Sequence, residues 1–244
     1  MNILCIGNSF SEDVTRYLHQ ISDEELYVRN LYIGGCSLER HYNNIIEEKA
    51  DYEYQKNGRM LRMISVNEAL TKKKWDFITV QQVSQLSGIA ESYEPYLSAI
   101  IEFIKERCPS AEILLHRTWA YDDKSDHPGF VNYGRSRKGM YEAIVNASNE
   151  MAKKHGLRVI PTGDAVELAR ELPEFSNGGL NINRDGFHLS LDYGRYLGGL
   201  VLFGFLTGKD PRGVTYEPEN TSKEINYKLK EIALVALQQN AQKN

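Results

Sequence analysis

Three residues have the types and the spacing of a serine nucleophile and the pair that would activate it. Ser9 lies in the stretch GNSFS, directly after the short apolar run NILCI. Asp185 and His188 lie three residues apart in RDGFHLS, so the carboxylate can hold one imidazole nitrogen while the other points elsewhere. Together they would supply a nucleophile, a base and a group that orients the base, which is the chemistry of acyl transfer.

Each of these motifs also has a purely structural interpretation. A Ser that follows a Gly at the end of a strand is commonly a turn or helix-capping residue. An Asp-x-x-His pair just before a helix is commonly a cap with a satisfied His. The combination favours catalysis, and the elements that position the two motifs decide whether they meet.

Apolar runs and helix-spaced apolar residues alternate along the chain and indicate these elements. After the first run, Ser11 is expected to cap a helix. Asn57-Gly58 between alternating residues predicts a β-hairpin near 52–63. The runs that predict strands are NILCI, LYVRNLYI, WDFITVQQ, AEILLHRTW and LRVIP.

Strands separated by helices predict a parallel sheet that is covered on both faces. We therefore expect a single α/β domain over residues 1–244, a three-layer α/β/α sandwich with a five-stranded parallel sheet of the flavodoxin-like kind. In such sheets ligands bind beyond the carboxyl ends of the strands, which is where the loop with Ser9 should emerge.

Composition excludes several classes of partner and site. The net charge of -4 provides no basic surface for nucleic acid or for an anionic membrane. Cys5, Cys36 and Cys108 are odd in number and lack CxxC spacing, so neither disulfides nor a zinc site is expected. No signal-peptide pattern precedes NILCIG, so the sequence as it stands predicts a cytoplasmic protein; a chain that had lost a leader would be periplasmic or secreted.

The motifs, taken in order, resemble the conserved blocks of the SGNH (GDSL-type) hydrolase superfamily. The blocks are IGNSFS near the N-terminus, NLYIGGCSL after the second strand and RDGFHLS near the C-terminus. Together with WDFITVQQVSQLSG and HRTWAY they resemble one bacterial branch of that superfamily, a domain of unknown function with GNSFS, QQxS and RDGxHLS motifs. The resemblance extends over most of the chain.

This resemblance implies a role for each matching residue. Ser9 would attack an ester carbonyl, His188 would take its proton and return it to the leaving alcohol, and Asp185 would hold the imidazole. The N–H groups of Ser9 and Gly35 would bind the oxyanion. No cofactor and no metal is implied.

Two positions depart from the superfamily's pattern. Asn8 replaces the usual Asp of Gly-Asp-Ser, and an amide can still bond to the N–H groups of the turn. The Gly-x-Asn-Asp block is missing, and VQQVS stands in its place. Gln82, or failing it Gln81, is therefore the expected third oxyanion donor.

The sequence says less about the substrate. Trp119 and Tyr121 follow the fourth strand and either stack on a sugar ring or pack in the core. Gln81 and Arg184 are further candidates for contact with the substrate, and Arg184 would bind an acidic group or pair within its own loop. The polar loop 122–127 has no spacing that closes a metal site.

We therefore expect a serine hydrolase of a small ester, an O-acyl (acetyl) group on a carbohydrate. One alternative is a catalytically weak or inactive carbohydrate-binding protein on the same scaffold, and another is an esterase of the lipase or thioesterase type. The expected partner is a small-molecule ester, and the sequence does not indicate an oligomeric state.

Overall fold

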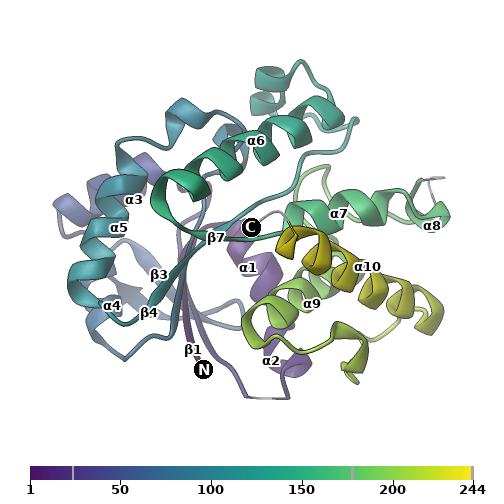
Figure 1. Ribbon diagram of the computed structural model, residues 1–244, viewed down its shortest axis with the longest axis horizontal. Coiled ribbons are helices and arrows are strands. Elements are labelled where there is room, and N and C mark those ends of the chain that lie inside the picture. Colours follow the sequence, from purple (N-terminus) through teal and green to yellow (C-terminus); the bar gives the residue numbers. More distant parts are fainter. Residues whose placement is uncertain (24, 177–178, 243–244) are drawn as a thin grey trace.

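The computed structural model describes residues 1–23, 25–176 and 179–242, and its centre is one sheet in the order β4-β3-β2-β1-β5-β6-β7 (Figure 1). The expected α/β class is confirmed, with β2, β1, β5, β6 and β7 mutually parallel. The sheet has seven strands instead of five, because β3 and β4 pair antiparallel at the β2 edge. The strands are β1 (Asn2–Gly7), β2 (Tyr27–Tyr32), β3 (Tyr52–Lys56), β4 (Arg59–Ile64), β5 (Phe77–Val80), β6 (Glu112–His116) and β7 (Arg158–Ile160).

Helices cover both faces of the parallel part of the sheet (Figure 1). Strand β1 is buried on both sides, with Ile3 and Cys5 packed on the face of α1, α7, α9 and α10, and Leu4 and Ile6 packed on the face of α3, α4, α5 and α6. The helices are α1 (Ser9–Thr15), α2 (Leu18–Ile21), α3 (Leu38–Ile46), α4 (Val66–Thr71), α5 (Tyr96–Arg107), α6 (Arg137–His155), α7 (Thr162–Arg170), α8 (Pro173–Ser176), α9 (Tyr193–Thr207) and α10 (Lys223–Ala241), and the short 3₁₀ turns are η1 (Ser84–Leu86), η2 (Ala90–Ser92), η3 (Pro128–Tyr133) and η4 (Pro211–Gly213).

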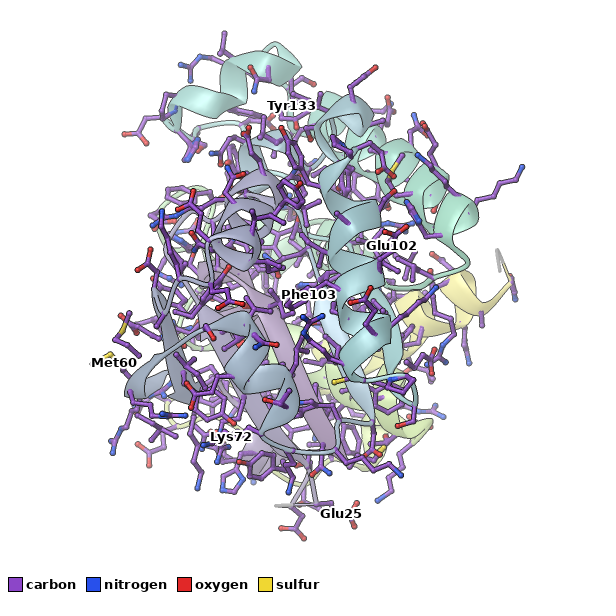
Figure 2. All side chains as sticks on the ribbon, turned by 90° about the vertical axis from the view of Figure 1, so that its left-hand side faces the viewer. Glu25, Met60, Lys72, Glu102, Phe103 and Tyr133 are labelled. Atoms are coloured by element: carbon purple, nitrogen blue, oxygen red, sulfur yellow. The ribbon has the colours of Figure 1, made fainter. Side chains whose placement is uncertain are left out.

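Strands β3 and β4 form a hairpin whose turn consists of Asn57 and Gly58. Both residues have positive φ, 53° and 71°, which is the backbone that an Asn-Gly turn between two strands adopts. The outer strand β4 is exposed along most of its length, and Met60, with 56% of its surface accessible, lies at the margin of the molecule in Figure 2. The hairpin therefore extends the sheet without contributing to the core as fully as the parallel strands do.

The first helix begins earlier than the sequence pattern predicts. Asn8 is the capping residue, because it has extended backbone angles and its Oδ1 accepts a hydrogen bond from the N–H of Phe10 at 3.0 Å. Ser11 lies inside the helix, where its hydroxyl donates to the Asn8 carbonyl at 2.8 Å. The expected cap at Ser11 is wrong, and the correction places Ser9 at the first helical position of α1.

The parallel strands place their following loops at one edge of the sheet. These loops contain Ser9 after β1, Gly35 after β2 and Gln81 and Gln82 after β5. Across the described ranges, the helices are all too short or too polar to meet the length and hydropathy of a membrane span.

Candidate active site

One hydrogen-bonded chain joins Ser9 to His188 and Asp185. In the sequence, at least 175 residues lie between Ser9 and each of the other two. The Ser9 Oγ lies 2.8 Å from Nε2 of His188, and Nδ1 of the same ring lies 2.7 Å from Oδ2 of Asp185. Since a carboxylate can only accept, Nδ1 carries the hydrogen and Nε2 is free to accept from the Ser9 hydroxyl. This is the arrangement that a Ser-His-Asp nucleophile requires.

The turn from Asp185 to His188 is held by its own carboxylate. Asp185 Oδ1 accepts the backbone N–H of His188 at 2.7 Å and that of Phe187 at 3.2 Å. Gly186 has a φ of 82°, and a Cβ there would lie 3.0 Å from the Ser125 backbone, so the turn requires glycine. Partial burial raises the pKa of Asp185, but the hydrogen bonds from His188 and Phe187 outweigh it and lower that pKa below its ordinary value.

A buried carboxylate that the sequence analysis did not single out connects this turn to α1. Asp13 lies one turn after Ser9, and its side chain is only 1% exposed. It accepts the N–H of Leu189 at 3.0 Å, Nη1 of Arg184 at 3.1 Å and Nε of Arg195 at 2.8 Å. The sequence does contain a signal for this residue, because an acidic side chain next to Val14 lies on the apolar side of a predicted helix. The local sequence does not reveal which residues Asp13 binds.

Ser9 and His188 face a cavity of about 310 Å³ at the carboxyl edge of the sheet. On one side it is bounded by the β2 loop and α1, and on the other by the β5 loop and the segment before η3. The cavity is small, and its wall combines polar and apolar side chains. Its other lining residues are Asn8, Phe10, Glu12, Tyr32, Gly34, Gly35, Val83, Ser84, Gln85, His127, Arg184 and Phe187.

Ser9 and Gly35, the two residues expected to supply backbone N–H groups, both line the cavity. The N–H of Ser9 is at the first position of α1 and has no acceptor within the helix. Gly35 lines the same cavity and has a φ of 61°. Glycine is favoured here by this left-handed backbone conformation. Crowding is not the reason, because no protein atom would lie within 4 Å of a Cβ at this position.

The amide of Gln82 does not reach this cavity, and the expectation that it supplies the third donor is not met. Its Nε2 donates to the carbonyl and hydroxyl oxygens of Ser92 at 2.9 and 3.1 Å. Its Oε1 accepts the N–H groups of Leu38 and Val83 at 3.0 and 2.8 Å. The side chain is fully used in joining three backbone segments, which is a structural role.

Gln81 points toward Asn8 and away from the open cavity. It is only 1% exposed, and its Nε2 donates to Oδ1 of Asn8 at 2.9 Å. The residue is therefore not positioned for direct contact with a substrate. Val83, Ser84 and Gln85 line the cavity from the β5 loop instead.

Trp119 and Tyr121 are core residues, so the interpretation that they stack on a sugar is wrong. Both are fully buried, and the Trp119 ring stacks on Phe10 with centroids 4.1 Å apart. The indole N–H donates to the carbonyl of Phe187 at 2.6 Å, and the Tyr121 hydroxyl lies 2.7 Å from Oγ of Ser84. They support the wall of the site from behind because the chain stays buried after β6.

His127 belongs to the polar loop 122–127, which the sequence analysis weighed only as a metal site, and the structure places it in the wall of the cavity. Its Nδ1 accepts the N–H of Gly129 at 3.1 Å, which leaves the hydrogen of the neutral ring on Nε2. Burial and the nearby His188 lower the pKa of His127. It therefore faces the site as a neutral hydrogen-bond donor. Among the described residues no His, Cys, Asp or Glu cluster is arranged to hold a metal ion.

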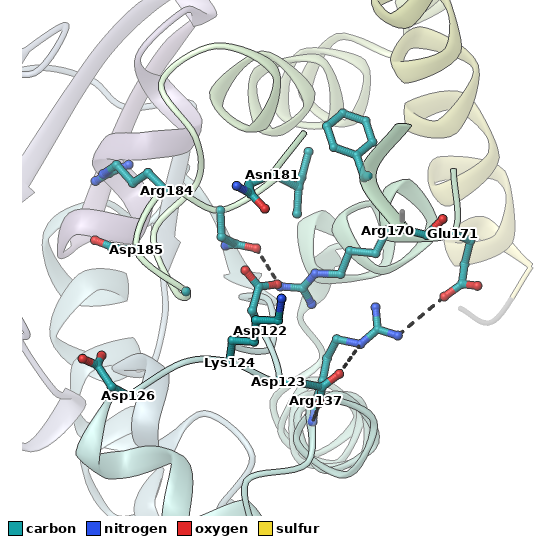
Figure 3. Close-up of a pocket in the computed structure, with 15 residues that line it drawn as sticks. Asp122, Asp123, Lys124, Asp126, Arg137, Arg170, Glu171, Asn181, Arg184 and Asp185 are labelled. Atoms are coloured by element: carbon teal, nitrogen blue, oxygen red, sulfur yellow. Dashed lines mark hydrogen bonds and ion pairs between the residues drawn. The ribbon is translucent and has the colours of Figure 1, made fainter. Parts of the chain in front are cut away.

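A larger cavity of about 630 Å³ is lined by Arg184, Asp185 and Gly186 of the turn that leads to His188 (Figure 3). Two of its arginines are paired across it: Arg170 contacts Asp122 at 3.1 Å and Arg137 contacts Glu171 at 3.6 Å. Ser9 and His188 do not line it. The smaller cavity is therefore the candidate active site, because the nucleophile and the base both face it.

Comparison with solved structures places the fold among the SGNH hydrolases. A candidate SGNH hydrolase from Slackia heliotrinireducens matches 84% of this chain with 98% of its own, at a TM-score of 0.59 and 23% identity. The acetyl xylan esterase AlAXEase matches 84% of this chain with 100% of its own, at a TM-score of 0.56 and 15% identity. At these identities the likeness is one of fold.

The chain belongs to the family described as Domain of unknown function (DUF4886), which it matches over residues 2–236. The crystal structure of a DUF4886 family protein from Bacteroides uniformis is 36% identical, with a TM-score of 0.91 over 98% of this chain and 95% of that one. Among curated proteins, none matches this sequence.

Proposed function

We propose that this protein is a serine ester hydrolase that removes a small O-acyl group, such as acetyl, from a carbohydrate. The observation that carries the proposal is the continuous chain from Ser9 Oγ to His188 Nε2 and from His188 Nδ1 to Asp185, at 2.8 and 2.7 Å. A Ser in a turn or cap needs no such partner, whereas a nucleophile does.

In the proposed mechanism, Ser9 Oγ attacks the ester carbonyl carbon while Nε2 of His188 accepts the hydroxyl proton. The N–H groups of Ser9 and Gly35 donate to the oxygen that becomes negative, and Asp185 stabilises the imidazolium. His188 then gives its proton to the leaving alcohol, which departs and leaves an acylated serine. Water, deprotonated by the same His188, releases the acid and restores Ser9.

The volume of the cavity favours a short acyl group, and its lining residues favour a polar alcohol. Its volume of about 310 Å³ is at the lower end for small-molecule sites, so a long acyl chain would not fit inside it. Glu12, Tyr32, Gln85 and His127 present acceptors and donors around the nucleophile, as a polyhydroxylated alcohol requires. These features favour a carbohydrate ester over the lipase or thioesterase alternative.

The test combines a reactive probe with a set of esters. We expect a fluorophosphonate to label the wild-type protein, and Ser9→Ala to lose both labelling and hydrolysis of p-nitrophenyl acetate by several orders of magnitude. Ser11→Ala is the matched control, because Ser11 lies in the same helix but outside the cavity lining, and it should keep both. Acetylated sugars and p-nitrophenyl octanoate then separate the substrate classes.

Two outcomes would contradict the proposal at different levels. A wild-type protein that is not labelled and hydrolyses no ester would favour the binding-protein alternative. A protein that prefers octanoate to acetate would retain the serine chemistry but overturn the assignment of a small acyl group.

A further inference from the structure

A row of buried polar groups crosses the sheet directly behind the candidate active site. It starts at Thr162 after β7 and passes through His116 at the end of β6, Gln81 after β5 and Asn8 after β1 to the carbonyl of Cys36 after β2. The successive distances are 2.9, 3.0, 2.9 and 3.1 Å. The order of the groups is the order of the strands in the sheet, so each parallel strand contributes one member.

Chemistry fixes the direction of every hydrogen bond in this row. The Cys36 carbonyl only accepts, so Nδ2 of Asn8 donates to it and Oδ1 of Asn8 accepts from Nε2 of Gln81. The Gln81 oxygen must then accept, so Nδ1 of His116 carries a hydrogen.

The other end of the row follows from the state of His116. Burial lowers the pKa of His116 to about 4, so the ring is neutral near pH 7. With the hydrogen on Nδ1, the Nε2 atom is an acceptor, and the Thr162 hydroxyl donates to it. All the donors thus point from β7 toward β2.

The end of this row joins the two backbone segments that contain the N–H groups proposed to bind the oxyanion. Asn8 precedes Ser9 in the chain, and its Oδ1 also accepts the N–H of Phe10. Cys36 follows Gly35, so the bond from Asn8 to the Cys36 carbonyl joins the two backbone segments that contain the N–H donors. The position of the Asn8 amide therefore sets their separation.

We propose that Gln81, His116 and Thr162 are positioning residues that act through Asn8 to hold the Ser9 and Gly35 N–H groups at the spacing required by the oxyanion. The inference rests on the proposed serine hydrolase function. It also explains Gly7, where a Cβ would lie 2.7 Å from Oγ of Ser11 and 3.1 Å from Cδ of Gln81. Position 7, at the end of β1, must lack a side chain so that the Gln81 side chain can cross the strand there.

The kinetic test compares two adjacent glutamines with different bonding. Gln81→Met keeps the volume of the side chain and removes both of its hydrogen bonds in the row, and Gln82→Met makes the same change in a residue that is equally buried. Gln82 has four hydrogen bonds, so a merely structural effect would make Gln82→Met the more damaging variant.

We expect the opposite order for catalysis. For p-nitrophenyl acetate, Gln81→Met should lower kcat by about 10- to 100-fold with little change in KM, because small displacements of catalytic donors cost rate and not substrate binding. Gln82→Met should keep kcat within about threefold of the wild type. Equal or larger loss of kcat in Gln82→Met, or an unchanged kcat in Gln81→Met, overturns the inference.

A measurement on the unmodified protein keeps the inference falsifiable if Gln81→Met does not fold. Nitrogen-15 NMR of the histidine side chains, with the His116 signals assigned by their loss in His116→Asn, should show Nδ1 protonated and Nε2 unprotonated at pH 7. In folded Gln81→Met the Nε2-protonated form should increase, because Nδ1 has lost its acceptor and Thr162 can accept instead. A wild-type His116 with the hydrogen on Nε2 contradicts the direction of the row and overturns the inference.

The same experiments distinguish this inference from the proposed function. Wild-type protein that the fluorophosphonate does not label overturns the hydrolase proposal and, with it, the catalytic role of the row. Labelled wild type together with equally reactive Gln81→Met overturns the positioning role alone.

Discussion

Asp13→Asn tests whether the buried carboxylate in α1 positions the base relative to the nucleophile. Asp13 accepts from Leu189 on the turn that contains His188, and from the guanidinium groups of Arg184 and Arg195. Asn keeps the shape of the side chain and one acceptor, but it removes the charge and places an N–H₂ group against a partner that is itself a donor. The turn with His188 would lose much of its connection to the helix with Ser9.

The expected loss of stability follows from the burial of the three charges. Removing one partner of a fully buried ion pair costs about 3 to 5 kcal/mol. Here the carboxylate is 1% exposed, but the Arg195 and Arg184 side chains are 13% and 30% exposed, so water can replace part of the interaction. We therefore expect the free energy of unfolding to fall by about 2 to 3 kcal/mol, and Tm by roughly 5 to 10 °C for a chain of this size.

At a temperature where the variant is still folded, the fall in stability by itself would leave activity unchanged. We nevertheless expect activity to fall, because His188 is displaced. A displacement of His188 by about 1 Å from Ser9 costs on the order of 100-fold, so kcat/KM for p-nitrophenyl acetate should fall by about 10- to 100-fold. Urea unfolding gives the first quantity, and steady-state kinetics at a temperature well below Tm gives the second.

Asp164→Asn is the matched control for this experiment. Asp164 is also a buried carboxylate, paired with Arg117 at 2.7 Å and with the Tyr141 hydroxyl at 2.9 Å, but it does not line the cavity. It should lose comparable stability and keep its activity. If Asp13→Asn is folded and as active as the wild type, or if Asp164→Asn loses as much activity, the reasoning that links Asp13 to His188 is refuted.

Two further predictions concern the turn with the base and the buried histidines. Asp185→Asn should lower kcat by about 10³- to 10⁴-fold, less than Ser9→Ala, because the orienting group contributes less than the nucleophile; stopped assays at pH 7 measure this, and equal loss in both variants would contradict the assigned order. Burial lowers the pKa of His116 to about 4 and that of His41 to about 3, whereas both take up protons near their ordinary value when unfolded. These two histidines therefore contribute their full stabilisation at pH values above the ordinary pKa of histidine. The stabilisation is lost as the pH falls toward 4 for His116 and toward 3 for His41, and the share of His116 alone is on the order of 3 kcal/mol. Urea midpoints between pH 7 and pH 4 should fall less steeply in His116→Gln than in the wild type, and identical slopes would exclude His116 as the cause.

Local patterns in the sequence predicted the five parallel strands and the hairpin. Apolar runs of four to six residues, such as NILCI and WDFITV, stand between helix-spaced segments, and these periodicities depend only on neighbours in the chain. Asn57-Gly58 predicted the turn between β3 and β4 because few other residue pairs adopt positive φ easily. The start of α1 was misplaced because Asn8 and Ser11 are both good caps, and only the backbone angles distinguish them.

The candidate site could be predicted as far as its residues belong to short motifs. Ser9 in GNSFS and the Asp185–His188 pair in RDGFHLS have recognisable spacing, and the structure brings them within hydrogen-bond distance of one another. The two glutamines of VQQVS have no such distinction, since adjacent residues of one type carry the same local information. Which of them faces Ser92 and which faces Asn8 depends on the strands and loops packed around them.

The sequence by itself therefore determined the α/β alternation and the candidate nucleophile, base and orienting acid, because these depend on residue type and spacing over a few positions. Tertiary structure alone decided that Trp119 and Tyr121 are buried, that Asp13 binds the turn of the base, and that a row of polar groups connects Thr162 to Asn8. The physical reason is that these contacts join residues from different strands and helices, and their partners are set by the order of strands in the sheet and by the packing of helices on it.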